Sequence, residues 1–556
     1  MSVVTHDDRC SPQLTSIPEM LACIFEYLRY SKYDLWGCCL VNKQWSALAM
    51  PLLWQNPTFS STKSLKAFQK TIIENPQVAK LVTELYTDRY KRHEVYPLTE
   101  LVAYLPALKH VYFDATHYVN ILLGSSKDRA PSFTNLKGIR FLEISPGAQG
   151  WAPLITTLNN CPQLEDLGLL INGDLHMTLS AIPSDFPDIK SLTSLDLQYY
   201  PQTASVDFFR SLITFMPNLR RFKLYSFFIS ADIVKVISQN CHNLEALHLI
   251  SAFMPADITA HKIFEYVATN QFGHKLREFW LNLVNYTQYI GALDIPSGVM
   301  HRFCDALSHV NDLQLCGITF NHGTMRYFAN NISENLKSFK LSKIYCRDIQ
   351  GVFNTEVWEI LFRRCGHSLE SLAIEYLELP SNIGQVIGTL CVQLKVLCFR
   401  YTTISEESIL DITEALGDRL EHLELRNTGL STAGLSHVLR NCHHLEYLDI
   451  GDRLTRPSVS ECGFREFIHR CGVKLTYLNF NDCWITNSHL EFIASFCWQL
   501  SVLKLINQQG LSDERIERIM MRCRRLENLF ILQEPHVSSG LTKKILAKIK
   551  QEFIYI

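Results

Sequence analysis

The feature of this sequence that most constrains its fold is a short apolar pattern that recurs along most of the chain. At residues 420–425, in the run LEHLEL, leucine occupies the first, fourth and sixth positions. The same pattern, with Leu, Ile, Val or Phe at its apolar positions, begins at residues 108, 136, 164, 192, 219, 244, 276, 310, 336, 369, 394, 420, 445, 475, 500 and 526. The mean period is about 28 residues, and chance does not sustain one period over so many copies. The chain is therefore predicted to be a repeat array and not a single core.

Each repeat is predicted to contain a strand followed by a returning helix. Residues 420–425 alternate apolar and polar side chains, which is typical of a strand. Residues 434–439 have apolar spacings of three and four, which indicate a helix, with Ser431 as its N-cap; Thr486 has the same place in the copy that begins at Leu475. Such units resemble leucine-rich repeats. We expect an α/β fold, a right-handed solenoid with a parallel sheet on its concave face and helices on its convex face.

The cysteines follow the same period. Eight of the 18 lie three or four residues before the first apolar residue of a copy: Cys161, Cys241, Cys365, Cys391, Cys442, Cys471, Cys497 and Cys523. This placement resembles the cysteine-containing subclass of leucine-rich repeats. A metal site is the alternative, but the sequence has no C-x-x-C pair. We expect the thiols to pack as small buried apolar groups.

A different segment precedes the repeats. Ser16 before Pro18-Glu19 is a helix-start pattern, and the apolar residues that follow within 21–28 share one helix face. A second helical stretch covers residues 35–49. A module of this size buries little of its own apolar surface, so some of that surface is expected to dock on a partner.

The residues of this module resemble the F-box motif over residues 11–57. The matching strings are Ile17-Pro18-Glu19-Met20-Leu21, Ile24-Phe25-x-x-Leu28, Cys39-x-Val41-Asn42-Lys43-x-Trp45 and Leu53-Trp54, with departures at Met20 and Asn42. With the repeats, the chain resembles F-box/leucine-rich-repeat proteins, the substrate receptors of Skp–cullin–F-box ubiquitin ligases. The resemblance implies contact with the Skp adaptor, and through it a cullin, by Pro18, Glu19, Leu21, Ile24, Phe25, Leu28, Val41, Trp45 and Trp54. Core packing is an equal alternative for the two tryptophans.

These patterns divide the chain into five parts. Residues 1–10 are expected to be a flexible tail, 11–57 the F-box, 58–107 a linker and N-terminal cap, 108–533 about sixteen repeats, and 534–556 a C-terminal capping helix. The basic amphipathic stretch 543–550 also fits a membrane-surface helix, although a solenoid needs a cap at its end.

A partner protein is expected to bind the concave face. Strand residues between and just after the leucines point away from the core, and aromatic and arginine side chains dominate binding energies at interfaces. The candidates for binding a substrate protein are Tyr112, Arg221, Tyr225, Trp280, Arg400, Arg426, Tyr447 and Tyr477. For any one of these residues, the alternative is that its side chain is merely exposed to solvent and binds no partner.

Composition and sequence motifs narrow the range of functions expected for this chain. The chain has 53 basic and 55 acidic residues, which gives no reason to expect nucleic acid as a partner. No secretory signal and no membrane-spanning run is visible, so a cytoplasmic or nuclear protein is expected. No nucleotide-binding, hydrolase or zinc-protease motif occurs, so we expect no catalytic residue, metal or cofactor. Two alternatives to a ligase receptor stay open: an interaction scaffold without a ligase role, and an enzyme that uses one of the cysteines.

Overall fold

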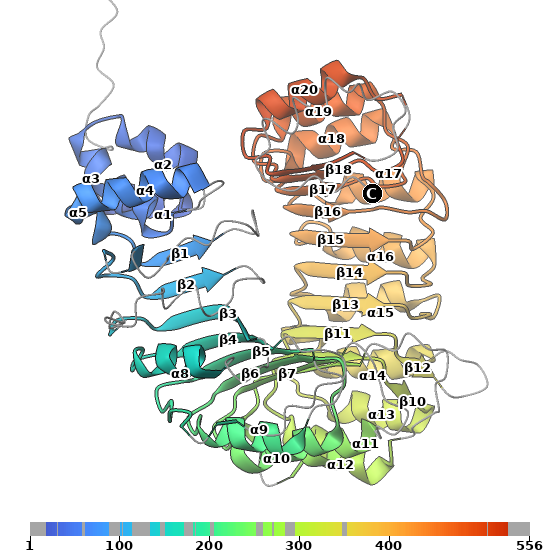
Figure 1. The fold of residues 1–556 in the computed structure, drawn as a ribbon. Helices are drawn as coiled ribbons and strands as arrows, with labels where there is room; N and C mark the ends of the chain where they lie inside the picture. The colour runs from blue at the N-terminus through green and yellow to red at the C-terminus, as the bar shows by residue number, and fades with distance from the viewer. Residues whose placement is uncertain are drawn as a thin grey trace, which may run out of the picture. The chain divides into compact units, whose positions relative to one another are not determined.

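The structure, a computed structural model, describes residues 18–29, 32–57, 62–87, 101–102, 104–113, 134–144, 151–171, 182–183, 185–200, 205–251, 260–269, 272–283, 295–346, 353–508 and 510–531 (Figure 1). The chain divides into two compact units, each considered by itself. Unit 1 comprises residues 1–172 and 183–192, and unit 2 comprises residues 173–182 and 193–556.

Unit 1 begins with a helical module. Its helices are α1 (Pro18–Tyr27), α2 (Lys32–Cys39), α3 (Lys43–Gln55), α4 (Thr62–Glu74) and α5 (Pro76–Ala79). The start of α3 is fixed by Asn42, whose Oδ1 accepts a hydrogen bond of 2.9 Å from the Trp45 N–H. An asparagine in this position satisfies a backbone donor that the helix itself leaves unpaired. Helices α1, α2 and α3 pack around a small apolar core.

Unit 1 continues into a parallel sheet. Its strands are β1 (Glu84–Thr87), β2 (His110–Phe113), β3 (Gly138–Ile144) and β4 (Asp166–Ile171), with helix α8 (Trp151–Asn159) between the last two. The strands pair in chain order, β1 with β2, β2 with β3 and β3 with β4. Strand β1 is a repeat strand that the sequence pattern missed, within the segment predicted as linker and cap. Val82 and Leu85 occupy the first and fourth positions, but the sixth is Thr87.

Unit 2 is a longer series of the same strand–helix units. Its main strands are β5 (Ser194–Tyr199), β6 (Arg221–Ser226), β7 (Ala246–Ser251), β8 (Glu278–Leu283), β9 (Asp312–Cys316), β11 (Ser338–Ser342), β13 (Ser371–Glu375), β14 (Val396–Arg400), β15 (His422–Arg426), β16 (Tyr447–Asp449), β17 (Tyr477–Asn479), β18 (Val502–Lys504) and β19 (Asn528–Phe530). Each pairs in parallel with the next in this order. A second ladder joins β10 (Thr319–Phe320) to β12 (Tyr345–Cys346).

The helices of unit 2 return the chain between successive strands. They are α9 (Val206–Thr214), α10 (Ala231–Asn240), α11 (Ala260–Val267), α12 (Ser297–Ala306), α13 (His322–Asn331), α14 (Thr355–Cys365), α15 (Ile383–Leu390), α16 (Glu406–Leu416), α17 (Thr432–Asn441), α18 (Glu461–Cys471), α19 (Asn487–Phe496) and α20 (Asp513–Arg522), with 3-10 turns η1 (Gly273–Lys275) and η2 (Gly366–Ser368). They lie on one side of the sheet, and the other side is the concave face of the unit (Figure 1). The predicted solenoid architecture is confirmed.

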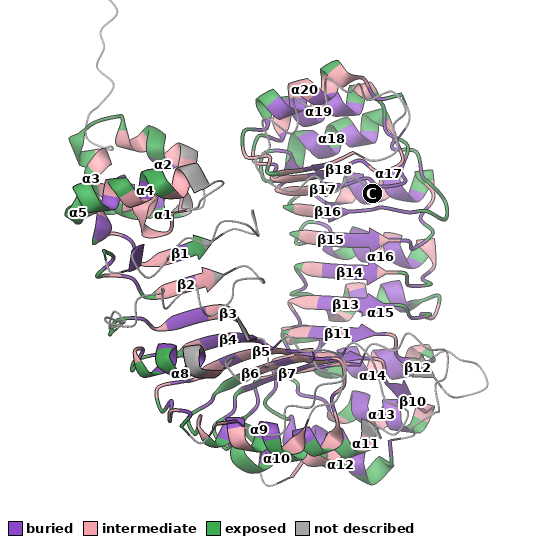
Figure 2. Cartoon of the chain, viewed as in Figure 1, coloured by how far each residue is buried: buried purple, intermediate pink, exposed green. Residues whose placement is uncertain are grey.

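The repeat pattern locates every strand that it predicted. Each of the sixteen copies contains a strand that begins two residues after its first apolar residue. Equivalent residues pair across neighbouring strands, so Leu423 lies between Leu397 and Leu448, and all three are at most 1% exposed. The core is therefore a layer of stacked apolar side chains, many of them leucines, between the sheet and the helices. Figure 2 marks the buried residues along the strands and helices. Each buried leucine contributes roughly 1.5–3 kcal/mol.

The predicted helix N-cap Ser431 and the predicted burial of the periodic cysteines are both observed. Ser431 Oγ accepts a hydrogen bond of 3.1 Å from the Gly434 N–H at the start of α17. The N–H and hydroxyl of Ser431 in turn donate to the carboxylate of Glu406, which links two neighbouring repeats. The eight periodic cysteines are free thiols, each at most 2% exposed at the end of a repeat's helix. Burial raises the pKa of the Cys161 thiol to about 12, which keeps it protonated.

Two predicted segments lie outside the described residues: the N-terminal tail 1–10 and the capping helix 534–556, together with the basic stretch 543–550. Among the helices that the structure describes, none has the length and hydropathy that a membrane span requires.

Two glycines with the same backbone conformation test how tightly the repeats stack. Gly317 has φ +76°, and a Cβ there would lie 1.9 Å from the carbonyl oxygen of Leu283 in the neighbouring repeat. Gly429 has φ +79° and open space around it. We expect Gly429→Ala to cost about 1 kcal/mol through the backbone alone, and Gly317→Ala to cost clearly more. The midpoint of chemical denaturation measures both, and equal losses would show that the Leu283 contact is unimportant.

Candidate docking surfaces

The helical module buries only part of its apolar side chains. Leu21, Phe25, Leu35 and Ala49 form its core, with Phe25 and Trp45 in edge-to-face contact at 5.3 Å between ring centroids. Lys32 fastens α2 to the last turn of α3, since its ammonium donates to the carbonyls of Leu52 (3.1 Å) and Leu53 (3.3 Å). Burial lowers the pKa of Lys32 to about 8. The helices are thus fixed by contacts that leave other apolar groups outside.

Those other groups form the exposed apolar surface of the module. Met20 is 46% exposed, Ile24 50%, Trp36 53%, Leu40 68% and Val41 57%. They come from α1, α2 and the turn that follows α2. Several large apolar side chains exposed on one small module make it a candidate for a surface that a partner protein covers. We call these five residues the module patch.

The nine predicted adaptor-contact residues fall into three groups. Pro18, Glu19, Ile24 and Val41 are exposed. Leu28, Trp45 and Trp54 are half-buried, and Trp54 stacks on Phe68 of α4 at 6.1 Å. Leu21 and Phe25 are 3% and 0% exposed, so their side chains pack the core and do not face a partner. We correct the prediction for these two, because a side chain with at most 3% of its area exposed offers almost no surface for an adaptor to contact.

The sequence prediction also omitted members of the module patch. Met20, Trp36 and Leu40 were not assigned to the docking surface. For Trp36 and Leu40 the available signal was the excess of apolar residues in residues 35–49 over what so small a module can bury. Periodicity does not assign Trp36 to a face, because the apolar residues of α2 do not gather on one side of the helix, and Leu40 lies beyond its end.

The predicted substrate-face residues lie on strands, in separate groups. Tyr112 of unit 1 pairs in register with Tyr86, and the two rings stack at 4.4 Å. In unit 2, Trp280 stacks on His248 at 3.7 Å with the rings 4° from parallel. In the same part of the sheet, Arg221 lies 3.9 Å from the carboxylate of Glu278, and the Lys223 ammonium lies 4.7 Å from the ring centre of Tyr225.

The second group of unit 2 lies on β14–β17. His422, Tyr447 and Tyr477 occupy the same position on neighbouring strands, and their rings stack at 3.8 and 3.9 Å. Burial, followed by the charge of Arg400, lowers the pKa of His422 to about 4. The predicted residues Arg400 and Arg426 pair in register on β14 and β15.

A buried carboxylate holds Arg400 in place. Glu424 is 1% exposed, and the Arg400 guanidinium donates to both of its oxygens, with Nη2 to Oε2 at 2.6 Å. This bond raises the pKa of Arg400. A paired charge of this kind tolerates burial. Arg426, by contrast, makes no ion pair with any residue that the structure describes.

Two kinds of chemical site, a metal centre and a reactive thiol among the buried cysteines, find no support in the residues that the structure describes. Within them, no three His, Cys, Asp or Glu side chains gather as metal ligands would. The buried cysteines have raised pKa values, which is the opposite of what a nucleophilic thiolate requires.

Comparison with known proteins identifies the module. The F-box-like family matches residues 18–60. Residues 18–60 are an F-box-like domain. The F-box protein SKIP19 of Arabidopsis thaliana is 31% identical over 134 residues, which cover 23% of this chain and 39% of that protein. The chain therefore spans less than half the length of this relative. The F-box resemblance of the sequence is confirmed, with a match that begins at Pro18.

Solved structures resemble the chain at low similarity. The Rad7–Elc1 complex of yeast contains a chain with 15% identity and a TM-score of 0.41, over 81% of this chain and 94% of that one. An internalin of Listeria monocytogenes has 18% identity and a TM-score of 0.34, over 58% of this chain and 76% of that one.

The pKa of His422 gives a pH test of the aromatic stack. Below pH 6.5 the unfolded chain takes up a proton at this residue, whereas the folded chain does so only near pH 4. Stability supplied by the neutral ring is therefore lost as the pH falls from 6.5 to 4. We expect the melting temperature of the wild type to fall relative to that of His422→Gln over this range. Parallel pH profiles would contradict the buried neutral imidazole.

Proposed function

We propose that this chain is the substrate-recognition adaptor of a Skp–cullin–F-box ubiquitin ligase. In this proposal the F-box-like domain docks on Skp, and Skp connects it to the cullin. The concave face of unit 2 binds a protein substrate, and the chain itself catalyses no step. The observation that carries the proposal is the module patch, apolar side chains about half exposed in an F-box-like domain.

The physical role of such an adaptor is to raise a local concentration. A substrate held near the ubiquitin-transferring subunits reacts as if it were part of the same molecule, so binding replaces bond chemistry in this chain. The long parallel sheet supports this role because it presents side chains from many neighbouring strands on one face.

Substitution of the module patch tests the docking step. We expect Ile24→Asp combined with Val41→Asp to weaken binding to purified Skp by at least about 30-fold, since central apolar contacts dominate interfaces. Both side chains are at least 50% exposed, so the variant should melt at the wild-type temperature. Leu454→Asp in unit 2, at a leucine that is 75% exposed, is the matched control. Unchanged Skp affinity in the double variant would refute docking through this surface.

Assembly with the cullin separates the proposal from its alternative. If the chain is a ligase adaptor, purified chain, Skp and cullin should elute together in size-exclusion chromatography. If the chain is an interaction scaffold without a ligase role, it should elute with Skp while the cullin elutes apart.

A further inference from the structure

One position in the repeat has the same backbone conformation in successive copies. The residue directly after the strand has positive φ in five neighbouring repeats of unit 2: Gly317, Lys343, Tyr376, Tyr401 and Asn427, with φ between +50° and +76°. In each, the backbone N–H donates to a carbonyl of the next repeat at 2.8–3.0 Å. The stacking of the repeats imposes this conformation whatever the side chain is.

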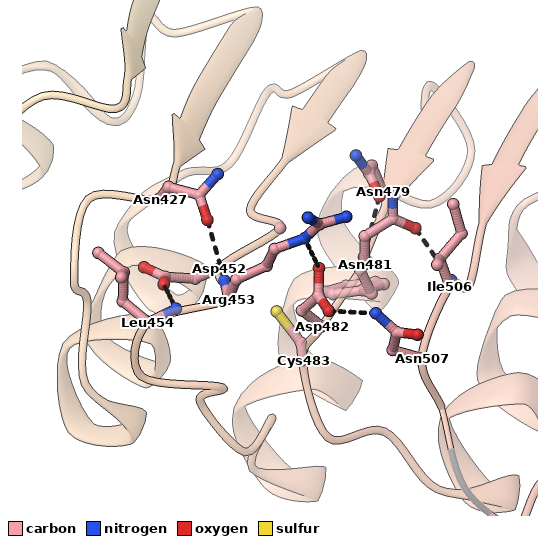
Figure 3. Close-up of polar contacts among 12 residues, drawn as sticks. Asn427, Asp452, Arg453, Leu454, Asn479, Asn481, Asp482, Cys483, Ile506 and Asn507 are labelled. Atoms are coloured by element: carbon pink, nitrogen blue, oxygen red, sulfur yellow. Dashed lines mark hydrogen bonds and ion pairs between the residues drawn. The ribbon is translucent and has the colours of Figure 1, made fainter. Parts of the chain in front are cut away.

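Glycine and asparagine suit this conformation, whereas a bulky side chain is strained in it. In the C-terminal repeats the residues of the strand-end turns serve the fold. Asn427 Oδ1 accepts a hydrogen bond of 2.9 Å from the Arg453 N–H, and Asn507 donates to the carboxylate of Asp482, as Figure 3 shows. Asp482 and Asn507 also have positive φ.

Tyr376 and Tyr401 serve no comparable purpose in the fold. Neither phenol hydroxyl makes a hydrogen bond to a described residue, and the side chains are 46% and 43% exposed. Their rings stack at 4.8 Å, 8° from parallel, and the Lys343 ammonium lies 5.2 Å from the ring centre of Tyr376. Two exposed tyrosines therefore occupy positions where asparagine or glycine would cost less strain. Strain of this kind is typical of functional sites.

Near these rings the arginine side chains are more exposed to solvent than the carboxylates between them. Arg400 is 40% exposed and Arg426 is half-buried, and they precede Tyr401 and Asn427. The carboxylates between them are buried: Glu375 is 9% exposed and Glu424 is 1% exposed. Glu378, two residues beyond Tyr376 in the sequence, is an exposed carboxylate. On β13–β15 the guanidinium groups therefore reach solvent more than the two carboxylates with which Arg400 pairs, and Glu378 is the acidic side chain exposed beside Tyr376.

We propose that Lys343, Tyr376, Tyr401, Arg400 and Arg426 form a docking strip for an extended acidic segment of a protein substrate. Repeats follow one another at about 4.8 Å, so a segment that runs along the array meets a ring or a cation in each. The guanidinium of Arg426 and the tyrosine hydroxyls bind carboxylate or phosphate oxygens. This inference rests on the proposed function, because it names the class of substrate that unit 2 binds.

The test uses the full chain and four labelled peptides of equal length. They alternate glycine with glutamate, phosphoserine, glutamine or lysine. We expect one or both anionic peptides to bind more tightly than the neutral and basic ones, with an affinity that falls as salt is added. The phosphoserine and glutamate arms distinguish the two sources of negative charge. Equal binding of the neutral or basic peptide, or no binding of either anionic peptide, would overturn the proposal.

The decisive variant is Tyr376→Asn combined with Tyr401→Asn. Because asparagine already occupies this position at Asn427, the variant should melt at the same or a higher temperature, while its affinity for the anionic peptide falls about tenfold or more. Arg426→Gln should weaken the same affinity and reduce its salt dependence, and Glu378→Gln should strengthen it. Arg465→Gln, at an exposed arginine of α18, is the control. It should change neither the affinity for the anionic peptide nor the salt dependence of that affinity.

Unchanged peptide affinity in the tyrosine variant would overturn the docking strip. Skp binding is measured on the same preparations. If the chain binds Skp but no acidic peptide, only the docking strip is contradicted. If the chain does not bind Skp, the proposed function is contradicted.

Discussion

The structure depends on the parallel, in-register stacking of equivalent residues from one repeat to the next. The backbone N–H at the start of a strand donates to the carbonyl of the residue just before the preceding strand, as His422 does to Lys395 at 3.1 Å. This register places leucine beside leucine along the array. No single strand–helix unit covers its own apolar face, so stability comes from the interfaces between neighbours. The tight approach of Gly317 to Leu283 shows how little room that stacking leaves.

The same register arranges the surface into rows, and the rows explain its chemistry. On β15–β17 one row is the stacked rings of His422, Tyr447 and Tyr477, whereas the strand-end row continues from Tyr376 and Tyr401 into Asn427. Because the backbone conformation is constant along the strand-end row, side chains as different as those of Tyr401 and Asn427 occupy equivalent positions in neighbouring repeats. A solenoid can therefore acquire a binding strip one repeat at a time.

The sequence predicted the strands well because their signal is local and repeated. It missed β1, since Thr87 interrupts the apolar pattern, although the neighbouring strand supplies the pairing. In the helical module the apolar face of α1 was identified, but periodicity does not tell which residues of that face contact the module's own helices. Phe25 and Ile24 are adjacent in sequence, yet one is buried against Trp45 and the other is half exposed.

The strand-end tyrosines were missed for another reason. The predicted substrate face included only residues within the strands, and positive φ is not visible in a single copy. Alignment of the copies provides the signal. The position directly after the strand is Gly317 in one repeat and Asn427 in another, and it is Tyr376 and Tyr401 in the two repeats that precede Asn427. Two tyrosines in a row otherwise suited to glycine and asparagine indicate a surface role.

The central claim is that the chain has two separate binding surfaces, one on the F-box-like domain and one on the strands of unit 2. Hydrogen–deuterium exchange of the full chain with and without purified Skp tests it most directly. The account predicts that Skp slows exchange in peptides from residues 18–57, around Ile24 and Val41, and leaves the strands β13–β17 unchanged. Protection of those strands by Skp, or no protection of residues 18–57, would contradict it.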